Sequence, residues 1–498
     1  MNEWAELDRA LGAMAASGPT EVREDGEWLA ELGGLRCELR PQGKNALVHL
    51  WSDERNLTRR VLHIREQSPD RIVLEVQRFG RSRLARLEFL RTETERAPAR
   101  TNREIFRARL SRLLAERFPD ATIDSLTASP DLEHSFSGVY VRGRMREGTR
   151  TWALLAVSPE ETAAAIERAL AFGILWLDWT RARADFHAVK GLRIFVPKGS
   201  AKLLRTPMQA LSPNAGVELF EFDPAERAIH RIDLADAGNL ESWLVPRREI
   251  EQACAEARAA MSKVHALALH LPPAGNEISV WLIPGTTEVS LRFRGLQFGK
   301  WSKEGIAFGL GDSQLRLTAK TEPALDRLLR RLDAHRNMYP QATNHPLYRA
   351  SPERWIETIV MQDPARLDAQ LDPAHLYAQV PAVAAGDRGV IDLLGVTRRG
   401  RLVVIELKAS EDIHLPIQAL DYWQRVRRHQ RDRDLERYGY FPGVQLDLKP
   451  PLVWLVAPAL RFHSSTETVL KYFSTEIEVT RIGLSENWRR DAKVVYRR

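Results

Sequence analysis

Two apolar runs, Gly389-Val390-Ile391-Asp392-Leu393-Leu394 and Leu402-Val403-Val404-Ile405-Glu406-Leu407-Lys408, decide the fold of the C-terminal part of this chain. Each run has the length and apolar character of a strand, yet each carries charged residues. Burying an unpaired charge costs several kcal/mol unless a partner or a metal ion offsets it. Side chains alternate between the two faces of a strand, so Glu406 and Lys408 share one face. Charged residues at these positions indicate a functional site; the alternative is a surface charge ladder on a half-exposed hairpin.

The segment between the two runs, Thr397-Arg398-Arg399-Gly400, has the composition of a turn. Its glycine can adopt the positive φ that a three-residue hairpin loop requires. With the last three of these residues as the loop, Asp392 lies opposite Glu406. Directly opposed residues have Cβ atoms about 4.5–5.5 Å apart, so the two carboxylates would be close enough to chelate one cation. A bulge at the glycine would change this register.

This arrangement resembles the PD-(D/E)XK nuclease superfamily, also called restriction-endonuclease-like. The core of that family is an α-β-β-β-α-β unit with Asp on the second strand and Glu-x-Lys on the third. Here a helix is expected to begin near Ser351, the hairpin follows, and a second helix begins at Leu415. In the second helix Gln418 and Tyr422 lie at i and i+4, on one face, and resemble the Gln-x-x-x-Tyr motif of the RecB-type branch. The resemblance extends from Ser351 to the C-terminus, and Ile391 stands where the family name has Pro.

The resemblance implies a metal site and a catalytic set. Bound Mg²⁺ or Mn²⁺ prefers oxygen ligands, which would come from Asp392, Glu406, the Leu407 backbone carbonyl and Glu357 of the first helix, with Glu353 as the second choice for that helix acid. The catalytic residues would be Asp392, Glu406, Lys408, Glu357, Gln418 and Tyr422. Lys408 would orient the attacking water and stabilise charge on the phosphate. The alternative for Glu357 is an ordinary solvated helix residue, and for Gln418 and Tyr422 it is helix packing.

Several arginines follow on the second helix or its continuation. The formal charge of the chain is +7, and basic proteins are attracted to polyanions. Arginine suits phosphate because its planar fork donates hydrogen bonds in pairs. The residues expected to hold the phosphate backbone are Arg425, Arg427, Arg428, Arg431 and Arg433; the alternative for this run is a solvated helix face.

A length of 498 residues predicts several domains. We expect a multidomain chain of α/β and α+β type, with a β-rich module at 1–100, a degenerate nuclease-like domain at 101–248, a helix and β-rich module at 249–345, and an α-β-β-β-α-β nuclease-like domain at 346–498. The two cysteines, Cys37 and Cys254, have no metal-ligand spacing and indicate a reducing compartment. The sequence has no signal peptide pattern and no apolar run of membrane-spanning length, so a cytoplasmic protein without membrane contact is expected.

An earlier segment, residues 103–245, resembles the C-terminal segment when the two are aligned without gaps so that Gly138 matches Gly389. The counterparts of Asp392, Glu406, Lys408, Glu357 and Gln418 in this alignment are Val141, Leu155, Val157, Phe106 and Glu167, respectively. We interpret the segment as a duplication that has lost the chemistry and serves as a scaffold, a dimerisation surface or a module that holds a polynucleotide. Chance is the alternative, because helix–hairpin–helix–strand is a common order.

Three functions are consistent with these residues. The leading hypothesis is a metal-dependent endo- or exodeoxyribonuclease in DNA repair or defence, with RNA as an alternative substrate. One competent site hydrolyses one phosphodiester at a time, which favours single-strand cleavage or nicking unless two chains form a homodimer. The second hypothesis is a nucleic-acid-binding protein with a vestigial nuclease fold. The third is a protein–protein scaffold whose basic faces meet acidic partners.

Overall fold

The computed structural model describes residues 3–17, 20–25, 27–32, 36–42, 45–51, 56–78, 84–91, 102–131, 134, 136–183, 188–235, 242–270, 277–283, 286–311, 314–340, 343, 345–384 and 387–498. Over these residues the chain is a mixed α/β protein whose strands form four sheets. It divides into two compact units, residues 1–100 with 253–352 and residues 101–252 with 353–498. The boundary predicted at residue 100 lies among residues 92–101, outside the described part. No helix of the described part is long and apolar enough to cross a membrane.

The N-terminal segment of the first unit is a seven-stranded antiparallel sheet in the order β2-β1-β7-β6-β5-β4-β3. Helix α1 buries Leu7, Leu11 and Met14 in the core of this segment, together with apolar residues of the strands. This helical spacing produces one apolar stripe. The elements are α1 (Glu3–Ser17), β1 (Thr20–Glu24), β2 (Glu27–Glu31), β3 (Arg36–Gln42), β4 (Asn45–Trp51), β5 (Asn56–Gln67), β6 (Arg71–Arg78) and β7 (Leu84–Arg91).

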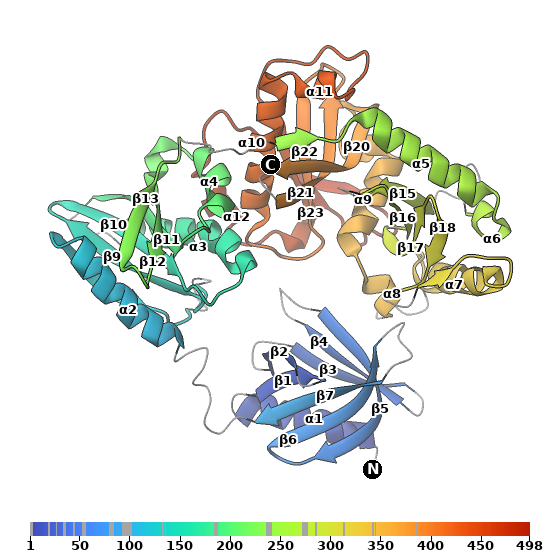
Figure 1. Cartoon of the computed structure of the whole chain (residues 1–498), viewed down its shortest axis with the longest axis horizontal. Coiled ribbons are helices and arrows are strands. Elements are labelled where there is room, and N and C mark those ends of the chain that lie inside the picture. Colours follow the sequence, from blue (N-terminus) through green and yellow to red (C-terminus); the bar gives the residue numbers. More distant parts are fainter. Residues whose placement is uncertain are drawn as a thin grey trace. The chain divides into compact units, whose positions relative to one another are not determined.

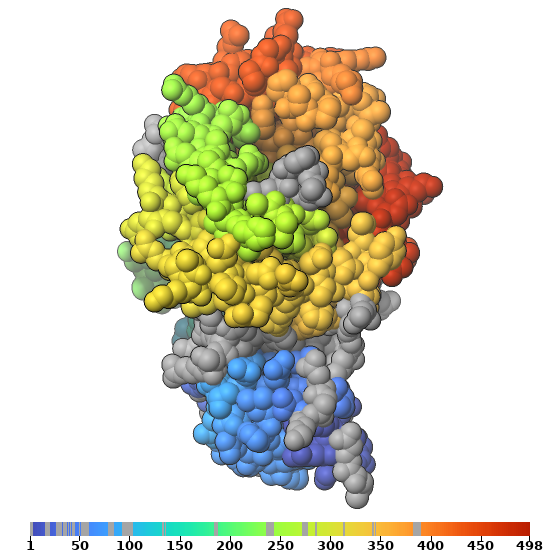
Figure 2. Space-filling model, turned by 90° about the vertical axis from the view of Figure 1, so that its right-hand side faces the viewer, coloured from blue at the N-terminus to red at the C-terminus, as the bar shows by residue number. Residues whose placement is uncertain are grey.

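The other segment of the first unit contains a five-stranded antiparallel sheet in the order β15-β16-β17-β18-β19. Helix α7 buries Leu325, Leu329 and Leu332, whereas its Arg327 and Arg330 are exposed. This segment is drawn in yellow in Figure 2. Helix α5 (Arg247–Ser262) begins in the second unit and continues into this segment. The further elements are α6 (His265–Ala268), β15 (Ile278–Leu282), β16 (Val289–Phe293), β17 (Leu296–Ser302), β18 (Gly305–Phe308), β19 (Leu315–Arg316), α7 (Glu322–His335) and α8 (Pro346–Arg349).

The second unit consists of two segments with the same order of elements apart from the additional short helix α11 of the second, and we call them the N-terminal repeat and the C-terminal repeat. The N-terminal repeat contains α2 (Asn102–Arg117), β8 (Ala121–Thr127), β9 (Tyr140–Glu147), β10 (Arg150–Val157), α3 (Ala163–Ala182), β11 (Val189–Pro197), α4 (Lys202–Gln209), β12 (Val217–Asp223) and β13 (Ala228–Ile232). The C-terminal repeat contains α9 (Pro352–Gln362), β20 (Leu371–Ala384), β21 (Asp387–Thr397), β22 (Leu402–Leu407), α10 (Leu415–Arg431), α11 (Asp434–Arg437), β23 (Leu452–Pro458), α12 (Thr466–Leu470), β24 (Val479–Leu484) and β25 (Val494–Arg497).

Strand pairing is also the same in the two repeats. One sheet has the order β13-β12-β11-β10-β9-β8, and the other has the order β25-β24-β23-β22-β21-β20, extended at its edge by β14 (Ser242–Leu244). In each sheet the three strands after the hairpin turn are parallel and the other neighbours are antiparallel. In the N-terminal repeat α2 covers one face of the sheet, and α3 and α4 cover the other (Figure 1).

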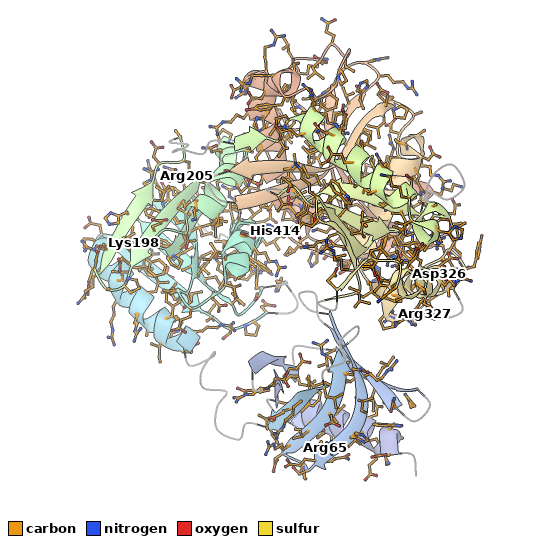
Figure 3. All side chains as sticks on the ribbon, turned by 45° about the vertical axis from the view of Figure 1, so that its right-hand side comes forward. Arg65, Lys198, Arg205, Asp326, Arg327 and His414 are labelled. Atoms are coloured by element: carbon orange, nitrogen blue, oxygen red, sulfur yellow. The ribbon has the colours of Figure 1, made fainter. Side chains whose placement is uncertain are left out.

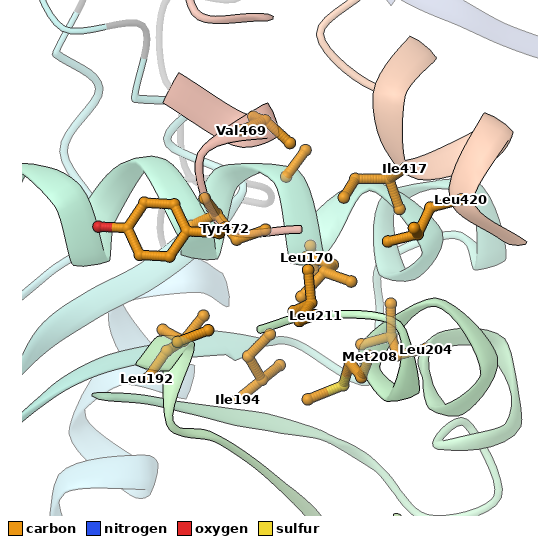
Figure 4. Close-up of a cluster of buried hydrophobic side chains, with 14 of the residues drawn as sticks. Leu170, Leu192, Ile194, Leu204, Met208, Leu211, Ile417, Leu420, Val469 and Tyr472 are labelled. Atoms are coloured by element: carbon orange, nitrogen blue, oxygen red, sulfur yellow. The ribbon is translucent and has the colours of Figure 1, made fainter. Parts of the chain in front are cut away.

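The two repeats share one hydrophobic core, and the helix contacts across it are reciprocal, since α3 is the counterpart of α10 and α4 is the counterpart of α12. Helix α3 packs against α12, and α4 packs against α10. Leu211 forms an antiparallel bridge with Phe473, each the same number of residues before β12 or β24. A residue that pairs with its own counterpart defines an isologous contact, so the repeats are related by a pseudo-two-fold axis. Figure 4 shows side chains on both sides of this interface, among them Leu170, Leu204, Met208, Ile417, Leu420 and Val469.

Candidate active site

The hairpin β21–β22 has the predicted register. Val396 pairs with Leu402, and Leu393 pairs with Ile405; one further step along this register places Asp392 opposite Glu406. Gly400 has φ of +84°, as the three-residue loop requires, and a Cβ at this position would lie 2.1 Å from the Gln445 carbonyl oxygen. No bulge interrupts the pairing between the loop and Leu393.

Both carboxylates are buried, which rules out the surface charge ladder. Asp392 is 7% exposed and accepts a hydrogen bond from the Leu407 backbone N–H at 3.0 Å. Glu406 is 0% exposed, and neither of its carboxylate oxygens has a hydrogen-bond partner among the described residues. Burial, followed by the negative charge of Asp392, raises the pKa of Glu406 well above its usual value. Glu406 is therefore a buried acid that receives no hydrogen bond from a donor of the described residues, although the carboxyl of Asp392 and the ammonium of Lys408 lie beside it.

Lys408 follows at the carboxyl end of β22 with its ammonium beside the acids. Its Nζ lies 3.9 Å from Glu406 Oε1 and 3.5 Å from Asp412 Oδ2. Burial alone would lower the pKa of Lys408, but the surrounding carboxylates raise it above its usual value. The side chain is 19% exposed, so the cation is held near the surface end of the site.

Helix α9 brings a second acid and an arginine to the same place. Glu357 is 1% exposed and is held by two donors, Gln379 Nε2 at 2.6 Å and Arg354 Nη1 at 2.7 Å. The same Arg354 nitrogen donates to Asp392 Oδ1 at 3.0 Å. Glu357 is thus a buried residue of the site and is not a solvated helix residue. Glu353, the second choice for the helix acid, accepts a hydrogen bond from the Ala409 N–H at 3.3 Å.

Sequence reasoning did not identify Arg354 or Gln379. Arg354 lies three residues before Glu357, a spacing at which two helical side chains meet, so the pairing of Arg354 with Glu357 could have been inferred from the sequence. Gln379 lies on β20 between Ala378 and Val380, which pair with Leu393 and Ile391 of β21, so Gln379 lies opposite Asp392. Its φ is +55°. A positive φ at glutamine has no sequence signal, because only glycine and, less often, asparagine and aspartate adopt it readily.

Gln418 and Tyr422 lie on one face of α10, as their spacing predicts. Gln418 Nε2 donates to the Tyr422 hydroxyl at 3.4 Å. Tyr422 is buried, and burial together with the charge of Glu406 raises its pKa. His414, labelled in Figure 3, immediately precedes α10, and burial lowers its pKa to about 4. The first turns of α10 therefore adjoin the acidic site.

The five arginines after Tyr422 differ in exposure and in their partners. Arg425 is 8% exposed and pairs with Asp421 at 2.7 Å, and Arg427 donates to the Leu448 carbonyl at 3.0 Å. The exposed members of the run are Arg428, Arg431 and Arg433. The C-terminal half of α10 lies near the start of β23, where Trp423 Nε1 donates to the Pro451 carbonyl, whereas the acids lie at the other end of the parallel strands. Arg428 and Arg431 follow Tyr422 on α10 by six and nine residues, which is about 9 and 14 Å along the helix axis, and Arg433 lies beyond the end of the helix.

In the N-terminal repeat the structure corrects the constant-offset alignment by one residue on β9. Leu155 pairs with Ile194 as Glu406 pairs with Leu455, so Leu155 is the counterpart of Glu406. The residue opposite Leu155, however, is Arg142 and not Val141. The cause is the β9–β10 turn, which is one residue shorter than the β21–β22 turn because Glu147 pairs directly with Arg150.

The residues named as counterparts in the N-terminal repeat are mostly buried. Val141, Leu155 and Val157 are each at most 1% exposed, and Phe106 is 8% exposed. Glu167, the counterpart of Gln418, is exposed on α3. This repeat therefore has apolar side chains where the C-terminal repeat has Glu406 and Lys408.

Within the described residues no group of three or more His, Cys, Asp or Glu side chains is placed to hold a metal ion. Glu406 and Asp392 are two adjacent carboxylates, and Glu357, the third acid, is joined to Asp392 through Arg354. Buried carboxylate oxygens that lack donors are suited to a hard divalent cation, so these acids fit the ion that the sequence predicts. No known protein-family model matches the sequence, and no curated protein matches it.

Proposed function

We propose that this chain is a divalent-metal-dependent nuclease of the PD-(D/E)XK type that cleaves one strand of DNA. One observation carries the proposal: Glu406 is fully buried, its oxygens have no hydrogen-bond partner in the described part, and it lies opposite Asp392 beside Lys408. An unsatisfied buried carboxylate is destabilising by several kcal/mol, so a purely structural position would favour an apolar residue. Such a group is expected where chemistry requires it.

Each residue of the site has a distinct role in this proposal. The ligands of Mg²⁺ or Mn²⁺ would be Asp392, Glu406 and the Leu407 carbonyl, with Glu357 able to join them. When bound, the ion would neutralise charge and acidify a water molecule for attack on phosphorus. Lys408, which its acidic neighbours keep protonated, holds the nucleophile and stabilises negative charge on the phosphate. Gln418 and Tyr422 brace the side of the site formed by α10.

The pseudo-two-fold arrangement supports cleavage of one strand. Two repeats that share a core in this manner resemble a nuclease dimer joined into one chain. Only the C-terminal repeat carries acids at the site, because Leu155 and Arg142 replace Glu406 and Asp392 in the other. One encounter with a duplex would therefore break one phosphodiester bond.

Digestion of supercoiled plasmid with Mg²⁺, Mn²⁺ or EDTA tests the function. We expect open-circular DNA to accumulate before linear DNA, with no cleavage in EDTA and none by the Asp392→Asn variant. Asp363→Asn, which changes a half-exposed acid paired with Arg366 on the surface, is the matched control and should cleave normally. Cleavage that persists in EDTA, or concerted linearisation by a chain shown to be monomeric by light scattering, would contradict the proposal.

A second function is favoured by one observation, namely that Arg354 already pairs with two of the acids. A vestigial nuclease fold that binds nucleic acid without cleavage would keep such pairs permanently. Mn²⁺ binding separates the two functions: a nuclease should bind the ion through Asp392 and Glu406, whereas a binding module should retain DNA affinity and show no such site.

A further inference from the structure

Arg354 lies among three acids of the candidate site. Its Nη1 atom is 2.7 Å from Glu357 Oε2 and 3.0 Å from Asp392 Oδ1, so one nitrogen joins two carboxylates from different elements. Its positive charge also acts on Glu406, where it favours the ionised carboxylate. Two of the three acids are thereby neutralised in part by a residue of the chain itself.

The exposure of these groups differs in a way that permits exchange. The side chains of Glu357 and Asp392 are 1% and 10% exposed, whereas that of Arg354 is 31% exposed. The acids are therefore fixed in the interior, and the guanidinium reaches them from the solvent side. Glu406, the remaining acid, has no hydrogen-bond donor in the described part and receives none from Arg354.

We propose that Arg354 is a resident counter-cation, which occupies Glu357 and Asp392 when no divalent ion is bound and competes with that ion for the same carboxylates. The proposal rests on the proposed function, because it takes the acids to be metal ligands. An ion that coordinates Asp392 would share this carboxylate with the Arg354 guanidinium, which already occupies one acceptor site of Oδ1. The ion is also repelled by the guanidinium, since like charges a few ångströms apart in a partly buried site interact strongly. Arg354 thus sets the affinity of the site for the ion.

Calorimetric titration of the full chain with Mn²⁺ tests this role without reference to cleavage. Arg354→Gln keeps a hydrogen-bond donor and removes the charge, and it should bind Mn²⁺ about tenfold more tightly than wild type, or more. Arg354→Lys retains the charge and should remain near wild type. Arg366→Gln, which removes an exposed arginine just beyond the far end of α9, should leave the Mn²⁺ affinity unchanged. Circular dichroism of each variant checks that the fold is retained.

The outcomes distinguish this proposal from the function on which it rests. Equal or weaker Mn²⁺ binding by folded Arg354→Gln, at a site that Asp392→Asn abolishes, overturns the role of Arg354 and leaves the metal site intact. Mn²⁺ binding that survives both Asp392→Asn and Glu406→Gln, or that is absent from all variants, overturns the metal site and with it the counter-cation. Binding that appears only when Arg354 is changed supports the competition in its strongest form. Should Arg354→Gln fail to fold, Arg354→Met supplies the same loss of charge with an apolar side chain of similar length.

Discussion

The N-terminal and C-terminal repeats place different chemistry on the same backbone. At one position across three neighbouring strands, the C-terminal repeat has Gln379, Asp392 and Glu406. The matching row in the N-terminal repeat is Thr127, Arg142 and Leu155. The sheet order and the helices are shared, so the fold by itself does not require acids in this row. Function depends on the residues of the site and not on the fold that carries them.

The buried polar groups of the two rows are satisfied to different degrees. Arg142 donates to the Ser129 carbonyl at 2.6 Å, and its guanidinium lies over the rings of Phe136 and Trp176, at 5.0 and 5.8 Å from their centroids. Its charge is accommodated by carbonyl oxygen and aromatic faces. Glu406 receives no hydrogen bond from a donor in the described part of the chain, and Lys408 Nζ lies 3.9 Å from its Oε1, at the long end of an ion pair. The N-terminal repeat is built as a structural element, whereas the C-terminal repeat retains an unfavourable group.

The largest expected difference between the repeats is catalytic. Asp392→Asn, Glu406→Gln and Lys408→Ala should each lower kcat for plasmid nicking by about a thousandfold or more, and combining two of them should add little, because the residues act as a unit. Leu155→Ala, at the position that matches Glu406, should leave kcat unchanged at a temperature where the variant is folded. Purified variants assayed in Mg²⁺ provide the comparison. A comparable loss with Leu155→Ala would show that the chemistry is shared between repeats.

The next difference concerns stability, and exchanging the two matching residues should reveal it. In EDTA, Glu406→Leu should raise the free energy of unfolding by about 1–3 kcal/mol, because it replaces a buried unsatisfied carboxylate by an apolar side chain. Leu155→Glu should lower it by about 3 kcal/mol, with Arg142 opposite able to offset part of the loss. Urea unfolding followed by tryptophan fluorescence measures both changes. If Glu406→Leu is destabilising instead, Glu406 has a structural partner and the contrast between the repeats is wrong.

The hairpin and its acids were predictable because local sequence determines them. The glycine at position 400 fixes the loop length, and the loop length fixes which strand residues face each other. The same logic explains the error on β9. The shorter β9–β10 turn places Arg142 opposite Leu155, and an alignment at a constant offset does not account for a one-residue difference in turn length. The mixed α/β class and the β-rich segments followed from the same local patterns.

Other parts of the site depend on tertiary contacts that sequence spacing does not encode. Arg354 reaches Asp392 only because α9 packs near the carboxyl end of β22, and these residues are far apart in the chain. The arginine run that begins on α10 was assigned to phosphate from composition, yet Arg425 is buried and Arg427 donates to a backbone carbonyl, which sequence spacing does not indicate. Composition gives the residue type, but packing determines what that residue can contact.

The smallest expected difference between the repeats is in the pH dependence of stability. The pKa of Glu406 is raised in the folded chain above the usual value of 4.5, so the folded state binds this proton more tightly than the unfolded state does. The resulting stabilisation is fully present below the unfolded pKa and is lost as the pH rises through the folded pKa. In EDTA, wild type should therefore lose free energy of unfolding relative to Glu406→Gln as the pH increases above about 4.5, by at most about 1.4 kcal/mol per pH unit. Lys408 does not produce this slope, because its raised pKa leaves it protonated in both states through neutral pH.

Leu155→Ala changes the matching position without a titrating group and should follow the wild-type pH dependence in parallel. Urea unfolding at a series of pH values from about 5 to 8 measures these slopes, and identical slopes for wild type and Glu406→Gln would mean that Glu406 is no more difficult to ionise than an exposed acid.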